Sequence, residues 1–143
     1  MKCDLIKSSN DDIEKLIEYK KQTIFEYAKD LSTSEINEIN NYVNSKVPKE
    51  INNYYNIIVD NKIVGCVLLT DKDDGKLLDE LYLEENYRNK GIGTDIIKNI
   101  IKENNIIYLW VYKLNTKAIS LYKKLGFNVI EDTESRYYMK YSN

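Results

Sequence analysis

The segment Arg88–Thr94 constrains the fold of this chain more than any other stretch. Before it comes an apolar, strand-like run, Leu77–Leu83, and after it a helix-like run, Asp95–Lys102. The segment itself carries Gly91 and Gly93, which permit a tight turn and let the backbone come close to a ligand. A strand, a glycine loop and the first turn of a helix form a physical arrangement for holding a diphosphate, because amide groups at a helix start have no partner inside the helix.

The loop favours an anion over a plain tight turn because Arg88 and Lys90 add full positive charges and Thr94 can hydrogen-bond nearby. Two other phosphate-binding patterns do not match. A dinucleotide-binding fingerprint needs a third glycine after Gly93, and a Walker A loop ends in Gly-Lys-Ser or Gly-Lys-Thr. The sequence therefore favours neither NAD nor a nucleoside triphosphate.

Length and charge narrow the class of protein. A chain of 143 residues predicts a single domain over residues 1–143, with enough surface to bury for a core. The formal net charge of -2 offers no basic face for nucleic acid. The apolar stretches are far shorter than the roughly 20 residues of a membrane span, and the N-terminal residues lack a secretory signal. We expect a cytoplasmic protein without a nucleic-acid or membrane partner.

The residues available for chemistry are limited by the absence of histidine. Histidine is the commonest general base and the commonest metal ligand, so a Ser-His-Asp or Cys-His mechanism within this chain is excluded. Cys3 and Cys66 are too few for a disulfide framework and lack metal-ligand spacing, so we expect no metal site. Cys66 lies in an apolar run, which favours a buried free thiol over a reactive one.

Hydrophobic periodicity predicts the element order β-αα-ββ-β-α-β-α-β-β. This order predicts an α/β protein with a mixed, mostly antiparallel central sheet of about six or seven strands and helices on both faces. A capping box, Ser32 with Glu35, opens the second helix, Pro48 is expected to close it, and Gly126 ends the last helix. The predicted ranges are strand 3–6, helices 11–28 and 32–47, strands 56–59, 63–70 and 76–83, helix 91–103, strand 106–111, a helix from 115 or 116 up to Gly126, and strands 127–130 and 136–141.

Two motifs point to a known family. The pattern Arg88-x-x-Gly91-x-Gly93 resembles the acyl-CoA pyrophosphate loop of the GCN5-related N-acetyltransferases, the GNAT family. Residues 115–127 are similar to a later motif of the same family, N-x-x-A-x-x-x-Y-x-K-x-G-F, and follow a strand as that pattern requires. The resemblance is specific from about Leu77 to Ile130 and covers the first half only as a compatible element order.

The resemblance implies an acyl-CoA-dependent N-acetyltransferase that passes acetyl directly from acetyl-CoA to an amine. It implies that backbone groups of one strand hold the pantetheine arm and that the glycine loop holds the pyrophosphate. The implied cofactor-binding residues are Leu81, Tyr82, Leu83, Arg88, Asn89, Lys90, Gly91, Ile92, Gly93, Thr94, Asn115, Ala118 and Tyr122. Asn115 also suits a plain helix N-cap, and the two roles are compatible.

Transfer to an amine needs a base and an acid. A carboxylate can remove the amine proton directly or through water, and Glu80 and Asp79 both lie on the apolar strand where the thioester is expected. We prefer Glu80, with Asp79 as the alternative, while a structural ion pair or a solvated face explains either equally well. By resemblance, Tyr122 protonates the leaving thiolate; the other interpretation is a core tyrosine.

The acceptor stays open. Acidic and aromatic side chains in residues 11–47 and 130–141 suit a cationic amine, but they also suit a solvated surface. A small-molecule amine, a polyamine, an aminoglycoside-like antibiotic and a peptide N-terminus are all compatible, and so is a homodimer. The alternative function is a catalytically silent GNAT-fold module that binds acyl-CoA as a sensor or binds a partner protein.

Overall fold

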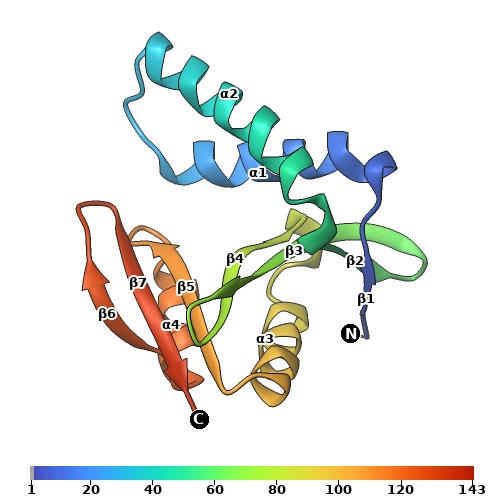
Figure 1. The fold of residues 1–143 in the computed structure, drawn as a ribbon, viewed down its shortest axis with the longest axis vertical. Helices are drawn as coiled ribbons and strands as arrows, with labels where there is room; N and C mark the ends of the chain where they lie inside the picture. The colour runs from blue at the N-terminus through green and yellow to red at the C-terminus, as the bar shows by residue number, and fades with distance from the viewer. Residues whose placement is uncertain (1) are drawn as a thin grey trace. The chain divides into compact units, whose positions relative to one another are not determined.

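The computed structural model describes residues 2–143, and its elements follow the predicted order (Figure 1). Three short 3-10 turns, at Asn10–Asp12, Ile51–Asn53 and Glu85–Tyr87, precede α1, β2 and α3. The helices and strands are β1 (Asp4–Lys7), α1 (Ile13–Tyr27), α2 (Thr33–Lys49), β2 (Tyr54–Val59), β3 (Lys62–Lys72), β4 (Gly75–Leu83), α3 (Ile92–Glu103), β5 (Ile106–Tyr112), α4 (Thr116–Lys124), β6 (Asn128–Asp132) and β7 (Arg136–Ser142).

The strands form a seven-stranded sheet in the order β1-β2-β3-β4-β5-β7-β6. The pairs β1–β2, β2–β3, β5–β7 and β6–β7 are antiparallel, whereas β4 and β5 pair in parallel. The parallel pair follows from the crossover through α3, because two parallel neighbours need a connection long enough to return the chain to the same end. The predicted mixed, mostly antiparallel sheet is confirmed.

The chain divides into two compact units, the first of which contains residues 2–68 and 80–85. Its core forms where the apolar stripes of α1 and α2, drawn in blue to teal in Figure 1, meet the buried residues of the strands. Helices α1 and α2 contribute Leu16 and Val43 to this core. Strands β2, β3 and β4 contribute Tyr54, Cys66 and Tyr82.

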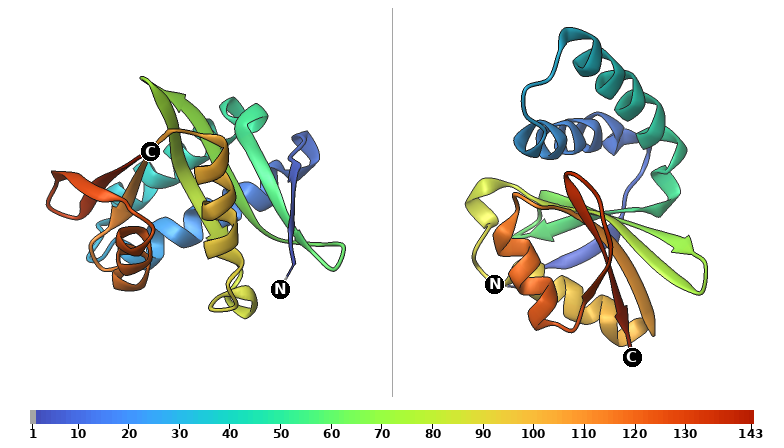
Figure 2. Two further views of the ribbon diagram at one scale, coloured as in Figure 1. Left: turned by 90° about the horizontal axis from the view of Figure 1, so that it is seen from below. Right: turned by 90° about the vertical axis from the view of Figure 1, so that its left-hand side faces the viewer.

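The second unit contains residues 69–79 and 86–143. Helix α3 buries one face through Ile92, Ile96, Ile97 and Ile100, the spacing of a helix with one apolar side. Strand β5 pairs with β7 along its whole length, and the β6–β7 hairpin, red in Figure 2, closes this end of the chain. Packing of this apolar face holds α3 in the second unit.

The ends of α2 test two sequence predictions. The capping box is confirmed, because the Glu35 amide donates to Ser32 Oγ at 3.1 Å and the Ser32 amide donates to Glu35 Oε1 at 3.0 Å. The prediction that Pro48 closes the helix is wrong, since α2 includes Pro48 and ends at Lys49. So close to the end, a proline costs the helix one hydrogen bond, and the Glu50 amide still donates to the Lys46 carbonyl at 3.1 Å.

The predicted hairpin turn and the predicted glycine after the last helix are both confirmed. Asp60 and Asn61 have φ of 50° and 65°, as a two-residue hairpin loop requires, so β3 begins at Lys62, one residue earlier than expected. Gly126 has φ of 105° and follows the end of α4, as predicted for a glycine just past a helix.

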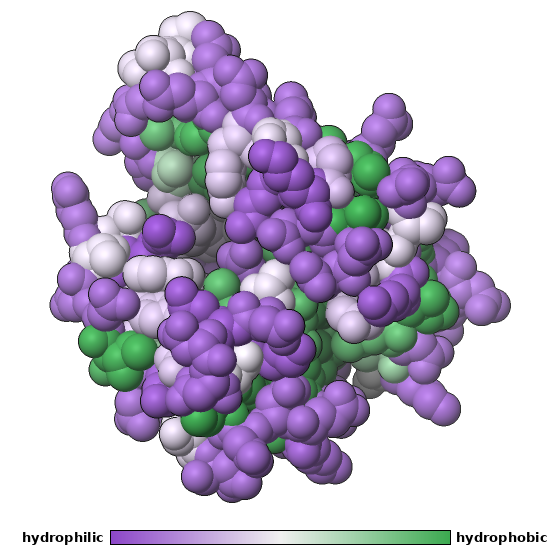
Figure 3. All heavy atoms as spheres, viewed as in Figure 1, coloured by the Kyte–Doolittle hydropathy of each residue, from purple (hydrophilic) through white to green (hydrophobic). Residues whose placement is uncertain are grey.

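Polar and charged side chains cover most of the face seen in Figure 3. Over residues 2–143, the helices are all too short or too polar to cross a membrane. In the same range, no three or more Cys, Asp or Glu side chains are grouped so that they could hold a metal ion.

Candidate active site

The glycine loop places the start of α3 with its amides pointing out of the helix. Asn89 and Gly91 have φ of 60° and 85°, so the chain turns sharply through the left-handed region before the helix begins. Gly91 is the N-cap, and the first helical bond runs from the Asp95 amide to the Gly91 carbonyl at 3.0 Å. By position, the amides of residues 92–94 have no acceptor within the helix.

The loop fits an anionic group. A Cβ added at Gly91 would meet no atom within 4 Å other than those of Gly91 and its two chain neighbours, so the backbone there faces open space that an anion can enter. Arg88 and Lys90 bring positive charge to the same loop, and α3 adds the positive end of a 12-residue helix dipole. Ile92 as a whole is only 1% exposed, so its side chain packs in the core and any cofactor role for this residue stays a prediction for its amide.

The second motif lies on and around α4. The Asn115 side chain accepts from the Ala118 amide at 3.3 Å, so Asn115 is the N-cap of this helix. Tyr122 is half-buried, and its ring lies 5.7 Å from the ring of Phe127, which is buried. The capping role of Asn115 is confirmed, and cofactor roles for Asn115, Ala118 and Tyr122 remain predictions.

The end of β4 carries residues predicted to meet the pantetheine arm. The Tyr82 ring is buried and stacks on Tyr19 with ring centroids 4.6 Å apart, and its hydroxyl hydrogen-bonds to Gln22 Oε1. Because the Tyr82 side chain belongs to the core of the first unit, its backbone is the part that can serve a ligand. Leu81 and Leu83 are half-buried.

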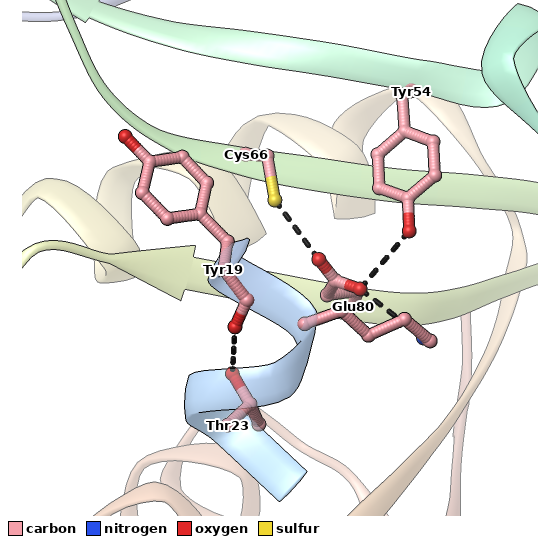
Figure 4. A network of polar contacts seen from close by, with 6 residues as sticks. Tyr19, Thr23, Tyr54, Cys66 and Glu80 are labelled. Atoms are coloured by element: carbon pink, nitrogen blue, oxygen red, sulfur yellow. Dashed lines mark hydrogen bonds and ion pairs between the residues drawn. The ribbon is translucent and has the colours of Figure 1, made fainter. Parts of the chain in front are cut away.

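Glu80, the preferred base, lies in a buried polar network in the first unit (Figure 4). The residue is 7% exposed, and both carboxylate oxygens accept hydrogen bonds. Oε1 accepts from Lys20 Nζ at 3.2 Å and from the Tyr54 hydroxyl at 3.1 Å, and Oε2 accepts from the Cys66 thiol at 3.0 Å. Lys20 is itself 7% exposed, so the network contains a buried ion pair.

The protonation of the neighbouring groups follows from their surroundings. Burial, followed by the charge of Glu80 and the hydrogen bond to it, raises the pKa of the Cys66 thiol well above its usual range. Cys66 is a buried free thiol, as predicted, and it stays protonated and donates to Glu80. Burial is also the main cause of the raised pKa of Tyr19, whose hydroxyl donates to Glu84 at 2.5 Å. Asp79, the alternative base, is half-buried.

One groove carries acidic and aromatic side chains of the kind considered for the acceptor. A groove of about 700 Å³ follows α1, lined by the carboxylates Glu14, Glu18 and Glu26 and by the apolar Ile17 and Phe25. Lys21 and Gln22 complete the lining. The carboxylates outnumber the single lysine, so the groove favours positive charge.

The aromatic side chains of β5 and β7 are largely buried, with Tyr108 and Tyr138 both in the core. The Tyr138 ring stacks on Tyr108 at 5.6 Å and lies 4.4 Å from Trp110. Its hydroxyl is buried and has no hydrogen-bond partner among residues 2–143, and burial raises its pKa. At the end of β6, Asp132 forms an ion pair with Lys113 and so has a structural partner.

Comparison with known proteins decides the family. The family model described as the acetyltransferase (GNAT) domain matches residues 50–129, which is more than half of the chain. The chain belongs to the GNAT family. The match begins just before β2 and includes the glycine loop of this GNAT protein and the whole of α4.

Individual relatives agree with the assignment. The chain is 32% identical over 71 residues to the peptidyl-lysine N-acetyltransferase YjaB of Salmonella typhimurium, covering 50% of this chain and 46% of that protein. It is 33% identical over 64 residues to the spermine/spermidine N(1)-acetyltransferase of Bacillus subtilis, covering 40% and 42% of the two chains. The matches thus span less than half the length of either relative.

A solved structure resembles the whole fold. The PaiA N-acetyltransferase of Thermoplasma acidophilum, in complex with coenzyme A, has a TM-score of 0.78, with 25% identity and 100% coverage of both chains. This agreement confirms that the predicted element order corresponds to the GNAT fold.

Sequence reasoning missed two members of the Glu80 network, Lys20 and Tyr54. A signal for Lys20 exists, because it lies at helical spacing from Leu16 and Ile17, on the apolar stripe of α1. A cation on one apolar face and Glu80 on an apolar strand together suggest a buried ion pair. Tyr54 has no comparable signal in a chain with 13 tyrosines.

Proposed function

We propose that this chain is an acyl-CoA-dependent N-acetyltransferase, acting as a single GNAT domain over residues 1–143. The observation that carries the proposal is the first turn of α3, where Gly91 opens the backbone and Arg88 and Lys90 supply charge. Membership of the GNAT family supports it, as does the likeness to a PaiA structure that contains coenzyme A.

In this proposal coenzyme A is held by residues of this chain at three places. The amides and basic side chains of residues 88–94 bind its pyrophosphate, since a helix N-terminus favours negative charge. Backbone groups of residues 81–83 bind the pantetheine arm. Asn115 and Ala118 at the start of α4, with Tyr122 further along the helix, line the same arm.

Bound acetyl-CoA would supply the acetyl group as a thioester. The acceptor amine must first lose a proton, which for a lysine-like amine near neutral pH costs roughly 4.6 kcal/mol. Glu80 takes this proton, directly or through a water, with Asp79 as the second candidate. The Tyr122 hydroxyl donates its proton to the departing sulfur. This role requires the hydroxyl to be protonated, the ordinary state of tyrosine near neutral pH.

We propose that the acceptor is a cationic amine. The groove along α1 favours positive charge through Glu14, Glu18 and Glu26. The two curated relatives are named for acceptors of this class, peptidyl-lysine in one and spermine or spermidine in the other. The reducing cytoplasm is the compartment that we propose, and the buried free thiol of Cys66 is compatible with it.

Calorimetry followed by an activity assay tests the function. Coenzyme A is titrated into the protein, and thiol release from acetyl-CoA is then measured over a panel of lysine peptides, polyamines, aminoglycosides and peptide N-termini. We expect binding and release with at least one cationic amine. Binding without release for any amine would instead favour the silent acyl-CoA-binding module, and no binding would refute both.

A further inference from the structure

We propose that Lys20 is a positioning residue for the acetyl transfer, because it keeps Glu80 ionised and oriented as the base. This inference rests on the proposed function and extends it to a residue of α1 that contacts Glu80 at 3.2 Å. Lys20 acts through Glu80, and no contact between Lys20 and the substrate is required.

The charge argument starts from the burial of both side chains, which are 9% and 5% exposed in Lys20 and Glu80. A buried carboxylate without an opposite charge tends to take up a proton and become neutral. The groups that face Glu80 are Lys20 from α1, Tyr54 from β2 and Cys66 from β3. Tyr54 and Cys66 donate as neutral groups, so Lys20 supplies the positive charge that keeps Glu80 ionised.

The orientation argument counts hydrogen bonds. A carboxylate offers about four lone-pair positions, and three are used by the ammonium, the hydroxyl and the thiol. The donors come from three separate elements, so the carboxylate is held at both oxygens and cannot rotate without breaking a bond. About one acceptor position remains for an amine proton or a bridging water.

The proton balance is simple. An N–H bond of the acceptor ammonium breaks and an O–H bond forms on Glu80, which leaves the nitrogen lone pair available for attack. After attack, the nitrogen loses a second proton as the C–S bond breaks, and that proton replaces the one that Tyr122 gives to the sulfur. Glu80 returns the first proton to solvent before the next turnover. Lys20 takes no part in the proton transfer and contributes its charge and its hydrogen bond to Glu80.

The pH dependence of kcat/KM in Lys20→Met and Lys20→Arg tests the proposal. Methionine fills similar space without charge, and arginine retains the charge. We expect the acidic limb of the profile to move to higher pH by about one unit or more in Lys20→Met and to stay near wild type in Lys20→Arg. A purely structural lysine would lower thermal stability and leave the limb in place, and that result would overturn the proposal.

A second measurement does not depend on activity. Infrared spectra near neutral pH should show a protonated-carboxyl band in Lys20→Met that is absent from wild type and from the double variant Lys20→Met/Glu80→Gln. Lys20→Gln, which keeps a hydrogen-bond donor without charge, serves if Lys20→Met does not fold. Absence of the band in the folded variant would refute the role of Lys20. Failure to acetylate any amine would refute the proposed function, and the spectra would still decide separately whether Lys20 keeps Glu80 ionised.

Discussion

At the scale of single residues, Glu80 shows why a candidate base must be judged with its partners. Its position on an apolar strand is compatible with a base and with a structural ion pair, and the structure places it against Lys20. The ion pair does not remove the chemical role, since a base has to be ionised before it can accept a proton. The Glu80 role as a base stays a prediction.

Tyr122→Phe separates chemistry from packing. Phenylalanine preserves the ring, whose centroid lies 5.7 Å from that of Phe127, and removes only the hydroxyl. We expect the single-turnover rate of acetyl transfer to fall by about 10²-fold or more, because a general acid contributes roughly that much. Calorimetry should show an almost unchanged Kd for coenzyme A. Comparable losses in rate and in affinity would assign Tyr122 to packing.

At the scale of elements, the start of α2 shows how a short sequence pattern fixes a helix end. The capping box of α2 lowers the pKa of Glu35, through hydrogen bonds from the Ser32 backbone and side chain. A carboxyl whose folded-state pKa is lowered stabilises the fold above its unfolded-state pKa, and this contribution disappears as pH falls through the folded-state pKa.

Glu35→Gln should therefore be less stable than wild type near neutral pH and approach it in acid. The measurement is the free energy of unfolding in urea over a series of pH values. Glu38→Gln is the matched control, because it makes the same charge change on α2 outside the capping box. A stability difference that is the same at every pH would show that the Glu35 charge has no part in the cap.

Gly91→Ala tests the start of α3, with Gly126→Ala as its control. Both glycines have positive φ, 85° and 105°, so each alanine should cost about 1 kcal/mol of stability. A Cβ at Gly91 would occupy the open space where the anion is expected, whereas one at Gly126 would lie 3.3 Å from the Tyr141 ring. We expect the Kd for coenzyme A to rise roughly tenfold, about 1.4 kcal/mol, only in Gly91→Ala. Equal changes of affinity in the two variants would count against the loop as the diphosphate site.

At the scale of the whole molecule, ligand binding and stability are linked. A ligand that binds only the native state at 100 times its Kd stabilises by about 2.7 kcal/mol, which raises Tm by roughly 5 °C or more in a chain of this size. We expect coenzyme A to give such a rise in a single unfolding transition, because β3 and β4 each contribute residues to both compact units.

Pantetheine lacks the diphosphate and is the control ligand for this measurement. Its rise in Tm at the same concentration should be much smaller. If pantetheine and coenzyme A raised Tm equally, the diphosphate would contribute nothing to binding and the start of α3 would lose its proposed role.

By itself, the sequence determined the element order, the capping box of α2, the hairpin turn at Asp60 and the glycine loop before α3. These features depend on residues close together in the chain, where propensity and spacing act directly. The sequence prediction placed the end of α2 too early. The effect of a proline depends on its position in the helix, and the last turn of α2 tolerates Pro48.

Only the tertiary structure decided which side chains meet Glu80. Its partners Lys20, Tyr54 and Cys66 lie 60, 26 and 14 residues away along the chain. No local sequence pattern links residues at such separations. The four side chains meet because α1, β2 and β3 bury their apolar faces in one core with the end of β4. The buried ion pair is a consequence of that packing, and the folded chain was needed to reveal it.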